Sequence, residues 1–240
     1  MAWRCSGKTN TELVQNMFNA GLITSERVKE AMLKQNVLTL NPPQVDRAHY
    51  TPLSPYSDSP QPIGHRATIS APHMHAAACE SLLPYLHPGA RVLDIGSGSG
   101  YLTHVLAELV QPGGKVVGVE HIPALVELAR GNTGKSEGGR GLLGSGGVRY
   151  VRGDGRVGWR DDGGEGMGWD AIHVGAAAAG GLEGVRRLEE QLGRPGRMFV
   201  PVEEEGGEQW VWVVSRDEKG EVRRERGVGV RYVPLTDAPE

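Results

Sequence analysis

Short apolar runs and helical patterns alternate through the middle of the chain. The apolar runs, each of strand length, lie at 91–95, 115–120, 148–151, 169–175 and 197–202. Residues 101–110 place Leu102, Val105 and Leu106 on one helical face, and residues 182–192 also have a helical pattern. Strands that alternate with helices predict a parallel sheet covered by helices.

The pattern changes towards the C-terminus. Residues 209–215 and 222–235 are both rich in strand-forming residues, and no helical pattern lies between them. Two strands joined without a helix form a hairpin, so the sheet is expected to end antiparallel. The expected fold class is therefore α/β with an antiparallel C-terminal hairpin.

The N-terminal part of the chain has helical patterns without this alternation. Thr9 and Glu12 have the spacing of a capping box in front of an apolar helical face. A second helix is expected at 25–35, a loop at 36–44, and an extended, irregular stretch at 46–66, which is rich in proline, serine and tyrosine.

A third helix is expected to begin near residue 70. Ser70 is its predicted N-cap, Pro72 lies in its first turn, and it runs to about Leu83. We expect one domain over residues 1–240, in which 1–89 form an N-terminal helical segment and 90–240 form the α/β core.

Composition adds limits to this picture. The chain has 26 Lys and Arg against 29 Asp and Glu, a net charge of -3, which gives no electrostatic reason to expect nucleic acid or an anionic membrane as partner. Cys5 and Cys79 form no motif, and we find no membrane-span pattern or signal-peptide core, so a cytosolic protein is expected. The glycine-rich stretches 131–147 and 163–168 are expected to be flexible surface loops.

The first strand of the alternation ends in an acid and a glycine loop. Asp94 is followed by glycine at 96, 98 and 100, in the form D-x-G-x-G-x-G. Strand, glycine loop and helix together are typical of a nucleotide-type site, because glycine lets a ligand approach the backbone closely. This form is closer to enzymes that use S-adenosylmethionine (SAM) than to the G-x-G-x-x-G of dinucleotide enzymes.

Two further acids follow the next strands. Glu120 ends the strand at 115–120, where a carboxylate can accept hydrogen bonds from both ribose hydroxyls. Asp154 follows the third strand and can accept from an adenine amino group. Because the ends of parallel strands meet at one edge of a sheet, the three acids are expected at one crevice.

Two other motifs carry less weight. His73 and His75 point to different helix faces, and no acid or cysteine accompanies them at ligand spacing, so no metal site is predicted. Residues 41–44, Asn-Pro-Pro-Gln, lack the aromatic residue of the motif in amino-group methyltransferases and precede the glycine loop, so a nucleic-acid amine is disfavoured as substrate.

Taken together, these motifs resemble the protein-L-isoaspartate (D-aspartate) O-methyltransferase family. The matching segments are 1–3, 56–61, 67–76, 94–100, 153–156, 170–177 and 232–237. The glycine loop is general to methyltransferases, whereas Thr-Ile-Ser-Ala-Pro-His-Met-His at 68–75 is far more specific. The resemblance implies a Rossmann-like class I SAM-dependent methyltransferase fold.

The resemblance also implies roles for individual residues. Ser70 is the implied active-site serine, expected to orient the substrate rather than to act as a nucleophile. The expected cofactor-binding residues are Ala67, Thr68, Ile69, Ser70, His75, Asp94, Gly96, Ser97, Gly98, Ser99, Gly100, Glu120, His121, Gly153, Asp154 and Thr236. The chain departs from the family in extra residues at 36–44, in the expansion at 131–147, and at Glu203 to Glu205, where glycine usually follows the strand.

The function implied is methyl transfer from SAM to the free α-carboxylate of L-isoaspartyl, and also D-aspartyl, residues in damaged peptides and proteins, which starts their repair. S-adenosyl-L-homocysteine (SAH) is the product, and a cytoplasmic monomer acting on protein rather than nucleic acid or membrane is expected. Two alternatives stay open from the residues alone. One is a non-catalytic SAM-binding module, and the other is a nicotinamide-dependent oxidoreductase.

Overall fold

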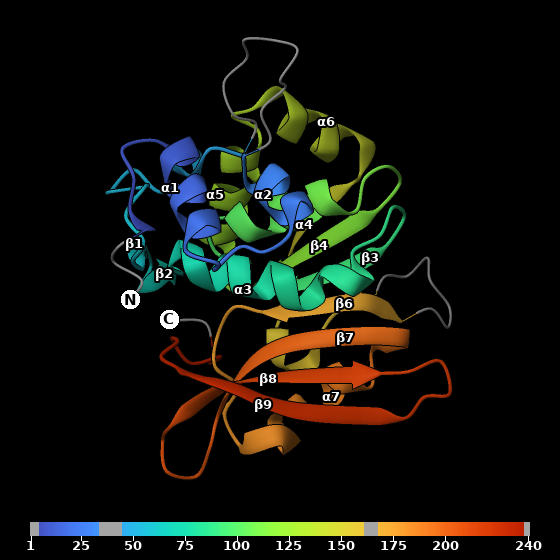
Figure 1. Cartoon of the computed structure of the whole chain (residues 1–240). Coiled ribbons are helices and arrows are strands. Elements are labelled where there is room, and N and C mark those ends of the chain that lie inside the picture. The colour runs from blue at the N-terminus through green and yellow to red at the C-terminus, as the bar shows by residue number, and fades with distance from the viewer. Residues whose placement is uncertain (1–4, 34–44, 161–167, 238–240) are drawn as a thin grey trace.

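The computed structural model describes residues 5–33, 45–160 and 168–237. Its centre is a seven-stranded sheet in the order β5-β4-β3-β6-β7-β8-β9, shown in Figure 1. The strands are β3 (Arg91–Ile95), β4 (Lys115–Glu120), β5 (Val148–Arg152), β6 (Trp169–Val174), β7 (Leu192–Glu203), β8 (Gln209–Arg216) and β9 (Val222–Val230). Strands β3 to β7 pair in parallel, and β7, β8 and β9 pair antiparallel. The predicted fold class and terminal hairpin are confirmed.

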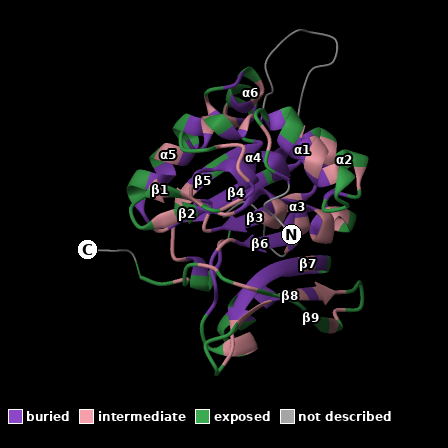
Figure 2. Cartoon of the chain, turned by 60° about the vertical axis from the view of Figure 1, so that its left-hand side comes forward, coloured by how far each residue is buried: buried purple, intermediate pink, exposed green. Residues whose placement is uncertain are grey.

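The two faces of the sheet bury different side chains, as the alternation of a strand requires. Val92 packs in one hydrophobic cluster, whereas Leu93 and Ile95 pack in the other. The first cluster also takes in the helices α1 (Asn10–Asn19), α2 (Glu26–Leu33), α3 (Pro72–Leu82), α4 (Tyr101–Leu109) and α5 (Pro123–Thr133). The second cluster packs against the 3₁₀ helix η5 (Gly181–Val185) and the short helix α7 (Arg186–Glu189). Figure 2 shows the central strands buried between these layers.

The first helix begins as its sequence predicts. Thr9 Oγ1 accepts from the Glu12 N–H at 3.1 Å, and Glu12 reaches back to the Lys8 N–H at 2.7 Å. The second helix spans Glu26–Leu33, and the expected loop at 36–44 lies outside the described residues. Most of the glycine-rich stretch 163–168 also lies outside them.

The stretch at 46–66 is more regular than expected. It holds a 3₁₀ helix, η2 (Arg47–His49), and the strand β1 (Gln61–Gly64), which pairs antiparallel with β2 (Ala67–Ile69). Composition concealed this hairpin because its turn, Gly64-His65-Arg66, lacks the usual Asn-Gly or Asp-Gly.

The expectation of a flexible loop at 131–147 is wrong. Helix α5 runs to Thr133, and helix α6 (Glu137–Ser145) follows, with Ser136 Oγ accepting from the Gly139 N–H at 3.0 Å. A Cβ on Gly139 would lie 1.9 Å from the Thr133 carbonyl oxygen, so glycine here permits close packing. Burial of Leu142 outweighs the poor helix propensity of the glycines.

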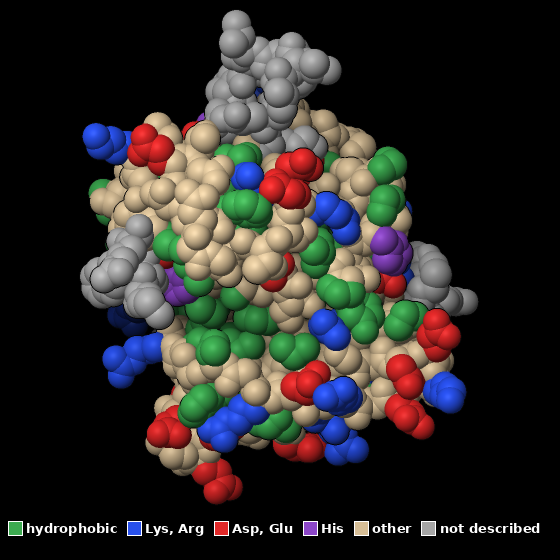
Figure 3. All heavy atoms as spheres, viewed as in Figure 1, with side chains coloured by type: hydrophobic (Ala, Val, Ile, Leu, Met, Phe, Trp, Pro, Cys, Tyr) green, Lys and Arg blue, Asp and Glu red, His purple; other side chains and the backbone are tan. Residues whose placement is uncertain are grey.

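Two other expectations are corrected. The helix expected at 182–192 is shorter, since η5 and α7 end at Glu189 and β7 begins at Leu192. Ala71, not Ser70, is the N-cap of α3, and no side chain of the cap residue bonds the helix. Among the described residues, no helix is long and apolar enough to span a membrane. On the face in Figure 3, acidic and basic side chains are intermixed.

Candidate active site

The glycine loop after β3 adopts a backbone that favours glycine. Gly96, Gly98 and Gly100 all have positive φ, at 73°, 52° and 85°. A Cβ on Gly100 would lie 2.7 Å from the hydroxyl of Tyr150. The Gly96 N–H donates to the Val119 carbonyl at 2.8 Å, which ties the loop to the end of β4. At its three glycines the loop therefore has no side chain that could block a ligand from the backbone at the edge of the sheet.

Asp94, two residues before the first glycine of this loop, has its carboxylate buried in the protein. The carboxylate accepts from Thr103 Oγ1 at 2.5 Å and lies 2.7 Å from Nδ1 of His173. His173 is its register partner on β6. Both oxygens are thus engaged within the protein, and Asp94 ties β3 to the neighbouring strand β6 and to the helix α4 that follows the loop.

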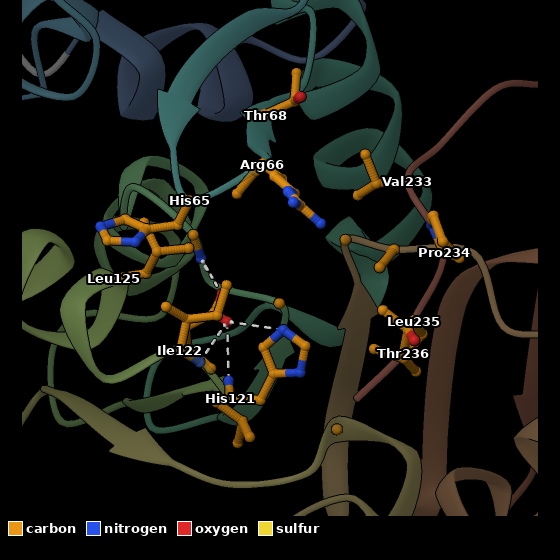
Figure 4. A pocket seen from close by; sticks show the side chains of 18 of the residues that line it. His65, Arg66, Thr68, His121, Ile122, Leu125, Val233, Pro234, Leu235 and Thr236 are labelled. Carbon is orange, nitrogen blue, oxygen red and sulfur yellow. Dashed lines mark hydrogen bonds and ion pairs between the residues drawn. The ribbon is translucent and has the colours of Figure 1, made fainter. Parts of the chain in front are cut away.

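Glu120 is the acid that faces the opening beyond the strand ends. Its Oε1 accepts from the N–H groups of His121 at 2.9 Å and Ile122 at 3.1 Å, and its Oε2 accepts from Gly98 at 3.1 Å. These bonds fix the carboxylate between the glycine loop and the start of α5. The dashed lines in Figure 4 show this arrangement.

A cavity of about 440 Å³ opens at these strand ends, a size suited to a small-molecule ligand. It is lined by His65, Arg66, Ala67, Thr68, Gly96, Gly98, Val119, Glu120, His121, Ile122, Leu125, Gly155, Gly175, Ala176, Val233, Pro234, Leu235, Thr236 and Asp237. Figure 4 shows Arg66 and Thr68 on one side, His121 and Ile122 below them, and Leu235 and Thr236 opposite.

The β1–β2 turn forms one wall of this first cavity. His65 and Arg66 have φ of 51° and 58°, in the left-handed region that non-glycine residues rarely adopt. Two consecutive positive φ values are the requirement of a tight hairpin turn. The turn places Arg66, which the sequence reasoning did not identify, at the cavity.

The C-terminal segment forms the opposite wall. After β9 the chain crosses back, and the Ala177 N–H donates to the Val233 carbonyl while Leu235 N–H donates to Ala177, both at 2.8 Å. Thr236 thereby reaches the cavity although it lies far along the chain from the glycine loop.

Asp154 lies beside the first cavity rather than in its lining. Its carboxylate accepts from Arg156 Nε at 2.9 Å, and Arg156 also pairs with Asp237. The Arg156 contact is the main reason that the pKa of Asp154 lies below its ordinary value. Its expected adenine contact stays a prediction.

A second cavity of about 450 Å³ adjoins the first. Its lining consists of Pro60, Thr68, Ser70, Ala71, His73, Met74, Gly175, Gly229, Val230, Arg231, Tyr232 and Val233. Thr68, Gly175 and Val233 line both cavities. Ser70 therefore lines a different cavity from Glu120, and the two cavities share three lining residues.

Distant side chains hold the turn that carries Ser70. The Asp58 carboxylate accepts from the backbone N–H of His73 at 3.0 Å and contacts its ring Nδ1 at 2.8 Å. His73 is the second residue of α3, so Asp58 supplies the cap that Ala71 lacks. The Ser70 side chain shares a hydrogen bond with Tyr232, whose pKa burial raises to about 12.

Arg47 supports the same turn from inside the protein. The side chain is fully buried, and its Nη2 donates to the Ser70 carbonyl at 2.7 Å. Its Nη1 lies 3.3 Å from Nδ1 of His75. Burial, with Arg47 as a second cause, lowers the pKa of His75 well below its ordinary value, so His75 is neutral and accepts from Arg47.

The structure divides the expected site residues into three groups. Those that line the first cavity are Ala67, Thr68, Gly96, Gly98, Glu120, His121 and Thr236. Those that line neither cavity are Ile69, His75, Asp94, Ser97, Ser99, Gly100, Gly153 and Asp154. Ser70 lines the second cavity. Sequence reasoning missed Gly175 and Ala176, although they follow the fourth parallel strand and its end meets the same edge.

Comparison with known proteins agrees with this arrangement. A sequence model described as "Protein-L-isoaspartate(D-aspartate) O-methyltransferase (PCMT)" matches residues 8–240. The chain belongs to this family. A protein-L-isoaspartate O-methyltransferase of Caenorhabditis elegans is 43% identical over 240 residues, which cover 100% of this chain and 98% of the relative. One of Triticum aestivum is 43% identical and covers 95% of this chain and 91% of the relative.

Solved structures support the fold and the cofactor. A putative protein-L-isoaspartate O-methyltransferase from Plasmodium falciparum, solved with SAH, superposes with a TM-score of 0.81 at 31% identity. The match covers 96% of this chain and 99% of that one. The expectations of a class I methyltransferase fold and of SAM as cofactor are thereby confirmed.

Proposed function

We propose that this protein transfers the methyl group of SAM to the free α-carboxylate of L-isoaspartyl residues in damaged peptides and proteins. The methyl ester that forms then closes to a succinimide, which reopens in part to normal aspartate. The same site is proposed to accept D-aspartyl residues.

One observation supports this proposal above the others: the two cavities meet. One holds Glu120 beside the glycine loop, and the other holds Ser70 at the start of α3. Thr68, Gly175 and Val233 belong to both linings. A methyl donor in the first cavity and an acceptor in the second would meet beside these three shared residues, as direct transfer between two bound molecules requires.

The residues of the first cavity fit SAM. Glu120 offers a carboxylate, already fixed by three backbone N–H groups, to the two ribose hydroxyls. The glycine backbone of the loop leaves room for close approach. Bound there, SAM would supply an electrophilic methyl group on its sulfonium for transfer to the acceptor oxygen, and SAH would be the product left behind.

The second cavity suits an anionic acceptor. No Asp or Glu is among the described residues that line it. An α-carboxylate has a pKa near 3.5 and is already ionised at neutral pH, so the reaction needs no general base. The remaining tasks are alignment and partial exclusion of water, which the walls and the Ser70 hydroxyl can provide.

Selection of isoaspartate over aspartate follows from geometry. An isoaspartyl residue carries its free carboxylate directly on Cα, whereas in aspartate it lies one methylene farther out. A misplacement of about 1 Å can lower the rate by on the order of a hundredfold when transfer must be in line. Ser70, at the start of α3, would orient the shorter group by a hydrogen bond from its hydroxyl.

The test uses labelled SAM and two peptides of identical sequence, one isoaspartyl and one aspartyl. We expect label in the isoaspartyl peptide, released by mild base as the ester requires, and at least a hundredfold less in the other. Equal labelling of both would refute the specificity. SAH binding with no transfer to either peptide would instead favour a non-catalytic SAM-binding module.

The expectations of a monomer, of a cytosolic location and of no nucleic-acid or membrane partner stay predictions. Light scattering at micromolar concentration tests the first, with a mass near 25.8 kDa expected for a monomer. Localisation by imaging a tagged chain tests the second, and binding assays with nucleic acid and vesicles test the third.

A further inference from the structure

The second cavity continues into a third hollow along the end of β9. This groove is lined by Gly207, Glu208, Gln209, Trp210, Gly229, Val230 and Arg231. Its last three residues also line the second cavity. Three spaces therefore follow one another: the first cavity with Glu120, the second with Ser70, and the groove beyond Arg231.

Arg231 lies where the second cavity and the groove meet. It is exposed, and within the described part of the chain no ion pair joins it to a carboxylate. The neighbouring cation Arg226 is different, because it pairs with Glu204 at 3.3 Å. The other basic group of the second cavity, His73, contacts the buried carboxylate of Asp58. Arg231 is thus an unpaired cation at this junction, whereas Glu208, the acid among the described residues of the groove lining, does not line the second cavity.

The groove offers a path for the rest of a peptide substrate. The lining of the groove comes from the start of β8 and the end of β9, where Gln209 pairs with Val230 and Trp210 with Gly229, so the groove crosses the end of this hairpin. An extended peptide advances about 3.3 Å per residue. With the isoaspartyl carboxylate beside Ser70, the residues next to it would therefore lie within reach of the long Arg231 side chain.

From this placement we infer that Arg231 selects substrates, favouring peptides with an acidic side chain within two residues of the isoaspartyl residue. The inference rests on the proposed function, because it assigns the groove to the same peptide. A preference for acidic peptides is the opposite of what the net charge of the protein, -3, would favour. Glu203, Glu204 and Glu205 line neither the second cavity nor the groove. Glu208 lines the groove but not the second cavity, so Arg231 is the charged group nearer to Ser70.

The experiment measures kcat/KM for isoaspartyl peptides that differ only in one flanking residue. Glu, Gln or Lys is placed one or two positions before or after the isoaspartyl residue, and each peptide has an aspartyl twin. For the wild type at low salt, we expect the best Glu peptide to exceed its Lys counterpart by about two- to fivefold, as a partly exposed ion pair allows. The preference should fall in high salt.

Variants of Arg231 test whether this residue causes the preference for Glu peptides over Lys peptides. Arg231→Gln should reduce the Glu-to-Lys ratio to about one, and Arg231→Glu should invert it. Arg187→Gln is the matched control, because Arg187 is exposed and lines neither cavity nor the groove, and because its replacement removes one positive charge, as Arg231→Gln does. It should keep the wild-type ratio.

The outcomes distinguish the role of Arg231 from the proposed function. A wild type that prefers Lys peptides or is indifferent, an Arg231→Gln variant that keeps the preference, or an Arg187→Gln variant that loses it would each overturn the role of Arg231. Isoaspartyl peptides would still be methylated in all of these cases. If no isoaspartyl peptide exceeds its aspartyl twin, the proposed function itself is wrong.

Discussion

Replacing Glu120 with glutamine tests the cofactor site most directly. The carboxylate accepts three backbone N–H groups, from Gly98, His121 and Ile122, at 2.9–3.1 Å. An amide of the same shape keeps one oxygen and turns an NH₂ group towards at least one of these donors. One N–H then loses its partner, which costs about 1–3 kcal/mol of folding stability.

The Glu120→Gln substitution should also weaken SAH binding, because the side chain at 120 would accept hydrogen bonds from the ribose hydroxyls of the ligand. A charged acceptor holds a hydroxyl by about 1.5–3 kcal/mol and a neutral one by about 0.5–1.5 kcal/mol, so the substitution should weaken binding by about 1–1.5 kcal/mol. We therefore expect the Kd for SAH to rise roughly tenfold. Isothermal titration calorimetry measures this Kd, and urea denaturation without ligand measures stability.

Asp170→Asn is the matched control. The Asp170 carboxylate accepts from the Arg91 N–H at 2.7 Å, at the opposite end of β3 from the glycine loop. This variant should lose stability but bind SAH within twofold of the wild type. If Glu120→Gln binds SAH as tightly as the wild type, or if Asp170→Asn weakens binding equally, Glu120 is not the ribose acceptor.

Three further predictions concern substrate, packing and pH. Ser70→Ala should reduce turnover of an isoaspartyl peptide at least tenfold while the Kd for SAH stays within a few-fold; normal turnover in the labelled-SAM assay would remove Ser70 from the site. Leu142→Ala should lower the free energy of unfolding by about 2–4 kcal/mol in urea, because the Leu142 side chain of α6 is buried in the core; a change below 0.5 kcal/mol would contradict that packing. Burial lowers the pKa of His75 below 6.5, so the unfolded chain takes up a proton below that pH while the folded chain does not. Stability should therefore fall as the pH drops through the window below 6.5, and His75→Gln should lose less stability than the wild type between pH 7.5 and 5.5; an equal loss would exclude His75 as a source.

Local sequence was sufficient for the strands of the sheet and for the glycine loop, and it identified Glu120 as one of three candidate acids at the strand ends. The apolar runs ending at Ile95 and Glu120 became strands at the predicted residues, because a run buried on both faces has few other stable conformations. The D-x-G-x-G-x-G loop needs backbone angles that glycine favours, and this need is local. The family and the cofactor followed from these motifs and from the segment at 68–75.

Tertiary structure decided which of the candidate acids lines the cavity and which residue caps α3. Asp94 and Glu120 both lie at or next to the last residue of their strands, yet His173 and Thr103 engage Asp94 while Glu120 lines the first cavity. The choice depends on partners that come from β6 and α4, which no spacing near Asp94 reveals. Likewise, Asp58 rather than Ser70 caps α3, because a chain segment folded against the helix start can supply an acceptor that the cap residue itself lacks.

The same physical reason explains the remaining differences. Glycines at 131–147 indicate a loop when each residue is taken alone, but α6 forms because Leu142 gains more from burial than the glycines lose in backbone entropy. Arg66 and Thr236 reach one cavity from segments far apart in the chain. Propensity and motif act over a few residues and are visible in the sequence, whereas burial and shared partners depend on long-range contacts that exist only once the chain has folded.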